Sequence, residues 1–211
     1  MKILLSLILG VSVLQAQVKE VKIGTQVWMA ENLNVATFRN GEPIPEAKTD
    51  EEWNKALVNH QPAWCYYNND PVNGKKYGKL YNWYAVNDPR GLAPRGWHIP
   101  TSDEWTTLSD FLGGDDNAGT KMKSKTGWKV GCNGTNSSGF NGLPGGWRYN
   151  DGIFSDIGTH GFWWSSTESE FDREYHAQDL VYDLHLNDCS GKAYGRSRDK
   201  HDYLSVRCLR D

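Results

Sequence analysis

Two segments of the chain combine a helix-start motif with apolar residues at helical spacing. In one of them, Thr101 and Glu104 have the spacing of a capping box, in which the hydroxyl and the carboxylate each bind a free backbone N–H group. Apolar residues then recur at i, i+3 and i+7, before a pair of glycines: Trp105, Leu108 and Leu112. This pattern predicts an amphipathic helix over residues 101–112.

The same motif occurs earlier in the chain. Thr49 and Glu52 repeat the capping-box spacing, and a short apolar face follows at Trp53, Ala56 and Leu57. We expect a helix over residues 50–58, and a further short helix over residues 117–124.

Alternating and aromatic stretches predict the strands of a small antiparallel sheet. Residues 21–29 form two alternating arms around Gly24-Thr25, and residues 149–152 (Tyr-Asn-Asp-Gly) are typical of a hairpin turn. Apolar stretches at 63–67 and 80–86 are joined by a turn-rich segment, and further strands are expected at 162–166, 179–186 and 204–209. Because residues 127–147 have no regular period, the pattern indicates one α+β domain with two main helices and long irregular loops.

The N-terminus resembles an export signal. One positive charge at Lys2 precedes an apolar run from Ile3 to Leu14, and Ala16 offers a small residue for cleavage. The run is shorter than the roughly 20 apolar residues that a membrane-spanning helix needs. We expect residues 1–16 to be a signal peptide and residues 17–211 a single exported domain without a transmembrane segment, located in the periplasm, at the outer surface or outside the cell.

Charge and aromatic content narrow the classes of partner. The net charge is −3 and the basic residues are dispersed, so we expect no nucleic-acid partner. The most basic segment alternates with acidic residues and predicts a solvated face: Arg196, Arg198, Asp199, Lys200, Asp202 and Arg207. Ten Trp and ten Tyr among 22 Gly indicate ordered loops held by large flat side chains.

Four cysteines in an exported chain predict two disulfides. They are Cys65, Cys132, Cys189 and Cys208. Three pairings are possible, and the spacing alone does not choose among them. A zinc site is the alternative, but no pair has the close spacing of zinc ligands.

No strong catalytic motif is present, because the sequence lacks G-x-S-x-G, H-E-x-x-H, the phosphate-binding G-x-x-x-x-G-K-[ST] and G-x-G-x-x-G. His185 and Cys189 lie four residues apart, and we interpret both as structural. The segment Asn68–Asn73 offers oxygen ligands for Ca²⁺, but it has one carboxylate, which favours an Asx-rich turn that closes a hairpin. We expect no catalytic residue, no metal and no cofactor.

Aromatic and polar residues of the C-terminal half are the candidates for a ligand surface, because Trp and Tyr stack on sugars and anchor protein partners. Trp163 and Trp164 must point to opposite faces of a strand, so we expect one in the core and Trp164 near a ligand. The candidate contacts lie in the segments 133–138, 150–156 and 172–194, or beside them: Asn150, Asp151, Phe154, Trp164, Tyr175, Tyr182 and Tyr194.

Several long motifs together resemble a known family. They include Ile23–Asn34, Tyr77–Val86, Gly96–Trp105, Gly139–Gly146 and Trp163–Glu168. The chain resembles the Fibrobacter succinogenes major paralogous domain from about Val21 to Asp211, a family with no settled activity.

A more distant similarity is to the formylglycine-generating enzyme group, whose fold is C-type lectin-like. Pro100–Trp105 is similar to the helix start of that group, and Val206-Arg207-Cys208 to its end. The enzymes carry a copper-binding cysteine pair upstream of a structural cysteine, whereas residues 179–188 contain no cysteine here. The resemblance therefore implies the fold without the oxidase activity, and it implies the pairing Cys65–Cys208 and Cys132–Cys189.

The sequence thus predicts a non-catalytic binding or adhesion module on a C-type lectin-like scaffold, with a glycan or protein ligand at a surface. Two alternatives remain at this stage. One is an enzyme with an unrecognised site, related to the formylglycine-generating oxidases. The other is a structural component of a surface assembly.

Overall fold

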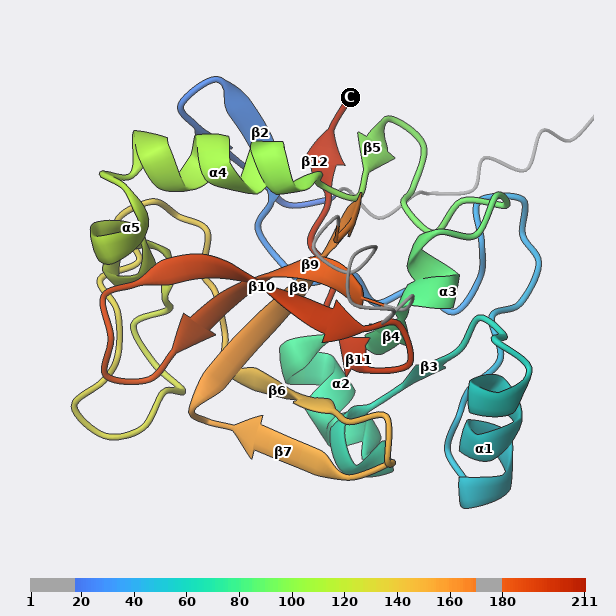
Figure 1. Ribbon diagram of the computed structural model, residues 1–211. Coiled ribbons are helices and arrows are strands. Elements are labelled where there is room, and N and C mark those ends of the chain that lie inside the picture. Colours follow the sequence, from blue (N-terminus) through green and yellow to red (C-terminus); the bar gives the residue numbers. More distant parts are fainter. Residues whose placement is uncertain (1–17, 170–179) are drawn as a thin grey trace, which may run out of the picture.

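The computed structural model describes residues 18–169 and 180–211 (Figure 1). The predicted signal peptide and Tyr175 lie outside these ranges. In chain order the elements are β1 (Glu20–Ile23), β2 (Gln26–Met29), α1 (Asp50–Val58), β3 (Trp64–Cys65), the 3₁₀ turn η1 (Tyr67–Asn69), α2 (Pro71–Tyr77), β4 (Leu80–Asn82), α3 (Trp83–Val86), β5 (Trp97–His98), α4 (Ser102–Phe111), α5 (Asp115–Met122), β6 (Gly145–Arg148), β7 (Phe154–Ile157), β8 (His160–Glu168), β9 (Leu180–Asn187), β10 (Ala193–Asp199), β11 (Tyr203–Leu204) and β12 (Leu209–Arg210).

The fold is mixed α and β, with antiparallel pairing between neighbouring strands. The described strands form three sheets instead of the one small sheet that the sequence predicted, in the orders β1-β2-β12-β5, β10-β9-β8 and β3-β4-β11-β6-β7. The last strand, β12, lies between β2 and β5, where Leu209 pairs with both Trp28 and His98. The C-terminus therefore holds the N-terminal hairpin in the fold.

Both capping boxes form as predicted. The Thr49 hydroxyl accepts from the N–H of Glu52 at the start of α1, and Thr101 accepts from Glu104 at the start of α4, while each glutamate binds back to the cap. These bonds satisfy backbone N–H groups that have no partner inside a helix. Helix α5 also forms, two residues earlier than expected at each end.

The predicted turn-rich connection between β3 and β4 is wrong, because it contains a helix. Asp70 accepts from the N–H of Val72, and Pro71 occupies the first position of α2. Proline is favoured there because its missing N–H would have no helical partner. In addition, the stretch 80–86 is a strand only to Asn82, whose side chain accepts from the N–H of Ala85 and starts α3.

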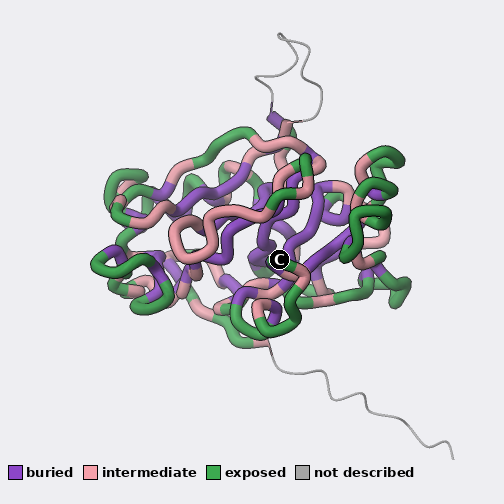
Figure 2. Tube along the Cα trace, turned by 90° about the horizontal axis from the view of Figure 1, so that it is seen from below, coloured by how far each residue is buried: buried purple, intermediate pink, exposed green. Residues whose placement is uncertain are grey.

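Alternation along the strands separates the core into distinct clusters. The sheet β10-β9-β8 has apolar residues on both faces: Trp163 and Leu184 contribute to one cluster, whereas Phe162 and Trp164 contribute to another. Trp163 and Trp164 are both fully buried, at 0% exposure. The expectation that Trp164 lies near a ligand surface is therefore wrong, because the strand is covered on both sides. Figure 2 shows this buried interior, with most exposed segments at the periphery.

One of the two expected disulfides is present. Cys132 and Cys189 are bonded, with their Cα atoms 4.5 Å apart. Cys65 and Cys208 are free and buried, so that pairing is wrong. Cys65 packs in one apolar cluster with Leu80 and Tyr203. Cys208 packs in another cluster with Tyr81 and Leu204, which are the next residues along the same two strands. Because neighbouring strand residues point to opposite faces, the sheet separates the two thiols.

Candidate functional site

A cavity of about 180 Å³ lies between helix α4 and the strands β9 and β10. Helices α4 and α5 pack against this sheet, and Figure 1 shows α4 next to it, above β9 and β10 in this view. The lining combines hydroxyl, aromatic and acidic side chains: Ser102, Trp105, Thr106, Ser109, Asp115, Tyr182, Asp183, Leu184, Tyr194 and Gly195.

The hydroxyl residues come from one face of α4. Ser102, Thr106 and Ser109 are spaced at i, i+4 and i+7, so the helix presents them on the same side. The N–H of Ser102 donates to the Thr167 hydroxyl of β8 at 3.0 Å, which fixes the start of the helix on the sheet.

Further hydrogen bonds hold this helix end from the other side. Glu104 accepts from the N–H of Thr101 at 2.8 Å, and its second oxygen lies 2.9 Å from the His98 ring. The other ring nitrogen of His98 lies 2.9 Å from Asp211, at the chain end. Burial lowers the pKa of His98, but these two carboxylates outweigh it and raise the pKa above 6.5. The α4 wall is therefore rigidly positioned.

Trp105 forms the apolar floor of the helix side. Its ring stacks on Trp28 with centroids 4.6 Å apart, and Phe140 meets it edge-on. The side chain is 4% exposed, and its indole N–H has no acceptor among the described residues. Buried donors in folded proteins nearly always have a partner, so this indole N–H is an exception within the packed cluster of Trp28 and Phe140.

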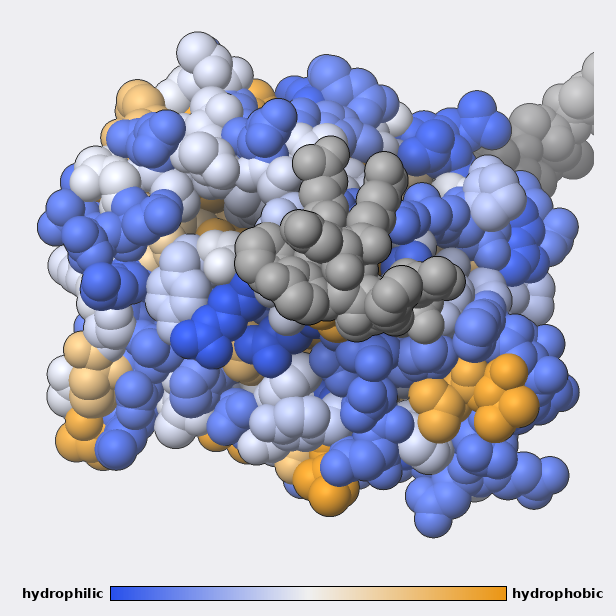
Figure 3. All heavy atoms as spheres, in the orientation of Figure 1, coloured by the Kyte–Doolittle hydropathy of each residue, from blue (hydrophilic) through white to orange (hydrophobic). Residues whose placement is uncertain are grey.

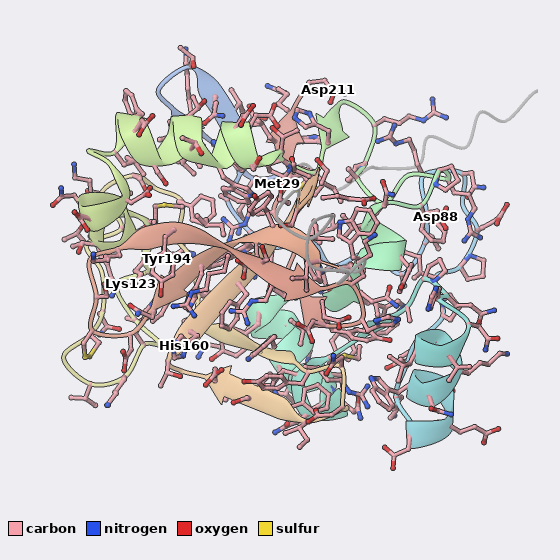
Figure 4. The ribbon with its side chains drawn as sticks, in the orientation of Figure 1. Met29, Asp88, Lys123, His160, Tyr194 and Asp211 are labelled. Atoms are coloured by element: carbon pink, nitrogen blue, oxygen red, sulfur yellow. A yellow bond between two sulfur atoms is a disulfide. The ribbon has the colours of Figure 1, made fainter. Side chains whose placement is uncertain are left out.

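The strand side of the cavity is built from the edge strand β10. On the face that meets α4, this strand carries three small residues: Ala193, Gly195 and Ser197. Tyr182 of β9 pairs with Ser197 and lies on the same face. Small residues next to a large aromatic one leave the space that the cavity occupies. Tyr194, labelled in Figure 4, borders the cavity from the neighbouring position on β10, while its ring meets that of His185 on the other face, with centroids 4.9 Å apart.

The opposite face of this sheet contains a buried ion pair. Asp183 lies 3.0 Å from the Arg198 guanidinium and accepts from the N–H of Arg196 at 2.9 Å. Burial raises the pKa of Asp183 to about 6, although Arg198 opposes the shift. Arg198 also covers the Trp147 ring at 4.2 Å. The pair fixes the register of β9 and β10 beside the cavity.

The expectation of a solvated basic face is therefore largely wrong. Arg196 is exposed, but Lys200 is buried, and Arg207 is 1% exposed, with its guanidinium over the Phe140 ring at 4.4 Å. Aromatic rings and hydrogen bonds to Asn32 replace the water that the charge pattern suggested for Arg207.

His185 is a second buried polar group on this face. Its ring stacks on Phe162 at 4.5 Å and on His160 at 5.2 Å. Burial and the nearby Arg198 charge lower its pKa to about 3, so the ring is neutral at ordinary pH. The interpretation of His185 as a structural residue agrees with this packing.

Of the predicted ligand residues within the described ranges, two line the cavity, Tyr182 and Tyr194. Asn150, Asp151 and Phe154 lie in the β6–β7 hairpin, where their contacts are internal. Asn150 donates to Asp202 and Asp199, and Asp151 accepts from the N–H of Ile153. Phe154 packs against Tyr67, with ring centroids 5.3 Å apart.

The α4 side of the site was not predicted from the sequence. The apolar stripe of this helix predicts its buried face, whereas the spacing of Ser102, Thr106 and Ser109 was the signal for a second, polar stripe. Tertiary packing was needed to show that this second stripe meets the edge of a sheet.

Among residues 18–169 and 180–211, three ligand atoms from His, Cys, Asp or Glu side chains lie close together at one place. They belong to Cys132, Asp188 and Cys189. The two sulfurs form the disulfide. In the segment Asn68–Asn73, the single carboxylate of Asp70 caps α2. Beside the disulfide, the buried Lys123 ammonium donates to the carbonyls of Cys132, Asn187, Asp188 and Ser190, which ties the end of α5 to the β9–β10 turn (Figure 4).

Comparisons with known proteins give one assignment. No curated protein and no solved structure matches the chain. Within the described part of the chain, none of the helices has the length and apolar character needed to cross a membrane. The Fibrobacter succinogenes major domain matches residues 21–210. This chain therefore belongs to the Fibrobacter succinogenes major domain family.

Proposed function

We propose that this protein is an exported, non-catalytic binding module on a C-type lectin-like scaffold, and that the α4–β10 cavity binds one sugar ring of a glycan. The observation that carries the proposal is the lining of the cavity. Hydroxyls of α4, the Asp115 carboxylate and the side chain of Tyr182 line one small space, which Tyr194 borders from β10. A sugar ring offers the matching groups, because it has hydroxyls around its rim and an apolar face.

The size and charge of the cavity favour a small polar ligand. Its volume of about 180 Å³ is below the roughly 300 Å³ at which pockets for drug-sized ligands begin. Asp115 is the acidic group from the helices, while Asp183 is neutralised by Arg198. A neutral sugar fits this mixture better than an anionic ligand.

Export is supported by two features. The N-terminal charge and apolar run are typical of a signal peptide, and the Cys132–Cys189 disulfide is typical of an oxidising compartment. Outside the grey atoms, Figure 3 shows separate apolar spots on this face and no continuous apolar patch. A large hydrophobic partner surface is therefore not favoured on this face.

The test uses two neighbouring threonines as a matched pair. Thr106 lines the cavity, whereas Thr107 faces the groove beside Gly24 and Phe111. Both are exposed and both hydroxyls bind the carbonyl four residues earlier. Thr106→Trp fills the cavity and should abolish binding to glycans selected on an array. Thr107→Trp should bind like the unchanged protein.

Calorimetry with the selected glycan measures the effect, and thermal unfolding confirms that both variants fold. Tyr182→Ala should weaken binding at least tenfold. If no glycan binds the unchanged protein, or if Thr106→Trp binds as well as Thr107→Trp, the proposed site is wrong.

A further inference from the structure

Three aromatic side chains from distant parts of the sequence meet on another side of the molecule. His60 follows the end of α1, Tyr84 lies in α3, and His201 lies in the turn between β10 and β11. Figure 1 shows these elements on the same side. The His60 ring stacks on Tyr84 at 5.1 Å with an interplanar angle of 8°, and its centroid is also 5.1 Å from that of His201.

His201 is oriented by a carboxylate. Its Nδ1 lies 2.7 Å from Oδ1 of Asp199, which also accepts from the His201 backbone N–H at 2.8 Å. The other oxygen of Asp199 accepts from the Asn150 side chain at 3.0 Å. A carboxylate bound to Nδ1 fixes the proton there and leaves a lone pair on Nε2. This is the arrangement that orients histidine ligands in metal sites.

The lone pair of His201 faces a phenol. Its Nε2 lies 3.1 Å from the Tyr84 hydroxyl. Ligand atoms at the corners of a tetrahedral zinc ion, with bonds of about 2.0–2.1 Å, lie roughly 3.3 Å apart. Two imidazole rings that share such an ion have centroids roughly 5 Å apart. The Tyr84–His201 and His60–His201 distances both agree with this geometry.

The surrounding charge favours a cation. The carboxylate of Asp199 contacts His201, and Asp202 adds a second carboxylate in the same turn. The nearest lysine in the sequence, Lys200, is directed to Glu168 at 3.3 Å and to the Trp83 ring at 4.8 Å. His60 is exposed, so its side chain is accessible to a metal ion from solution.

We propose that His60, His201 and the oxygen of Tyr84 bind one divalent transition-metal ion, Zn²⁺ or Cu²⁺. The ion takes the place of the hydrogen between Tyr84 and Nε2 of His201. The phenol proton is released to solvent, the phenolate and two neutral imidazoles coordinate the metal, and water completes the shell. Asp199 is a positioning residue, because it acts on the metal through His201. Imidazole and phenolate are ligands that both ions accept.

Titration of the tag-free full chain with ZnSO₄ or CuSO₄ tests the site. Calorimetry should show one ion per chain, with proton release that depends on the buffer. Copper should also give a tyrosinate-to-copper charge-transfer absorption. Tyr84→Phe should remove that absorption and weaken binding, and Asp199→Asn should weaken binding about 10–100-fold while the absorption is retained at saturation.

His98 provides the matched control. Like His201 it contacts a carboxylate through a ring nitrogen, but its other ring nitrogen meets a second carboxylate instead of a tyrosine. His60→Ala and His201→Ala should each lower the affinity at least tenfold, while His98→Ala should not change it. Unfolding midpoints separate these losses from misfolding. The proposal is overturned if one-to-one binding persists in His201→Ala, if His98→Ala removes it, or if the unchanged chain binds neither ion. Glycan binding by the α4–β10 cavity is independent of each outcome.

Discussion

Helices α1 and α4 begin with the same chemistry and end in different surroundings. Each starts with Thr-x-x-Glu, and the residue after the glutamate is tryptophan. In α4 this residue, Trp105, is buried against Trp28. In α1 it is Trp53, which is half-buried and lies near the Arg148 guanidinium at 5.4 Å. The caps are equivalent, but α4 buries more of its surface and, of the two helices, lines the cavity.

This difference shows that a capping box determines where a helix begins but not how much of the helix is buried. Helix α1 buries Ala56 alone, whereas α4 buries Trp105, Leu108 and Ser109. The contribution of α4 to stability should therefore come mainly from packing, and that of α1 from its cap. Three measurements test this comparison.

Replacement of the two tryptophans should give the largest difference. Trp105→Ala removes a buried aromatic side chain and should lower the free energy of unfolding by about 3–5 kcal/mol. Trp53→Ala removes partial burial and a cation–π contact and should cost about 1–2 kcal/mol. Urea unfolding of both variants gives the two values. Equal losses would show that α1 packs as strongly as α4.

Removal of the two caps should have smaller and similar effects. Thr101→Ala and Thr49→Ala each leave a helix N–H without its acceptor, which typically costs about 1 kcal/mol. Urea unfolding provides the measurement, with Thr107→Ala as a control for the loss of a threonine outside the cap. A cap whose removal costs nothing would contradict the equivalence of the two helix starts.

The smallest effect concerns pH. Hydrogen bonds from Thr49 lower the pKa of Glu52; burial raises that of Glu104, but bonds from Thr101 and His98 outweigh it and lower that pKa. Each glutamate therefore contributes to the free energy of unfolding at pH values above its ordinary pKa of 4.5. This contribution is lost as the pH falls through the lowered pKa of the folded state. The raised pKa of His98 has the opposite sign: its contribution is present below 6.5 and is lost as pH rises through the folded-state value.

An NMR titration of His98 distinguishes the two glutamates. Its pKa should lie above 6.5 in the unchanged protein and fall in Glu104→Gln, because that variant removes one of the two carboxylates. Glu52→Gln, the matched change in α1, should leave it the same. An unchanged value in Glu104→Gln would mean that the Glu104 contact does not form in solution.

Parts of the fold could be predicted because their causes are local. The capping boxes of Thr49 and Thr101 place helix starts within four residues of chain, and the Tyr-Asn-Asp-Gly turn places a hairpin in the same way. The helix α2 carried such a local signal as well, since Asp70 and Pro71 are typical of a helix start, but the turn-forming residues around them obscured it.

The candidate sites could not be predicted in the same way. The cavity needs the second stripe of α4 to meet the small residues of β10, and the metal site needs His60, Tyr84 and His201 from three distant elements. The tyrosines Tyr182 and Tyr194 were found because aromatic residues are good candidates anywhere. Their shared location depends on the pairing of β9 with β10.

The sequence by itself determined the family, the helix starts, the principal hairpins and the mixed α and β class. Only the tertiary structure decided which faces of each strand are covered. That decision buried Trp164, separated Cys65 from Cys208 across a sheet and buried Arg207 against the Phe140 ring. The physical reason is that hydrogen bonds at caps and turns act between near neighbours in sequence, whereas burial depends on the element that packs against a residue.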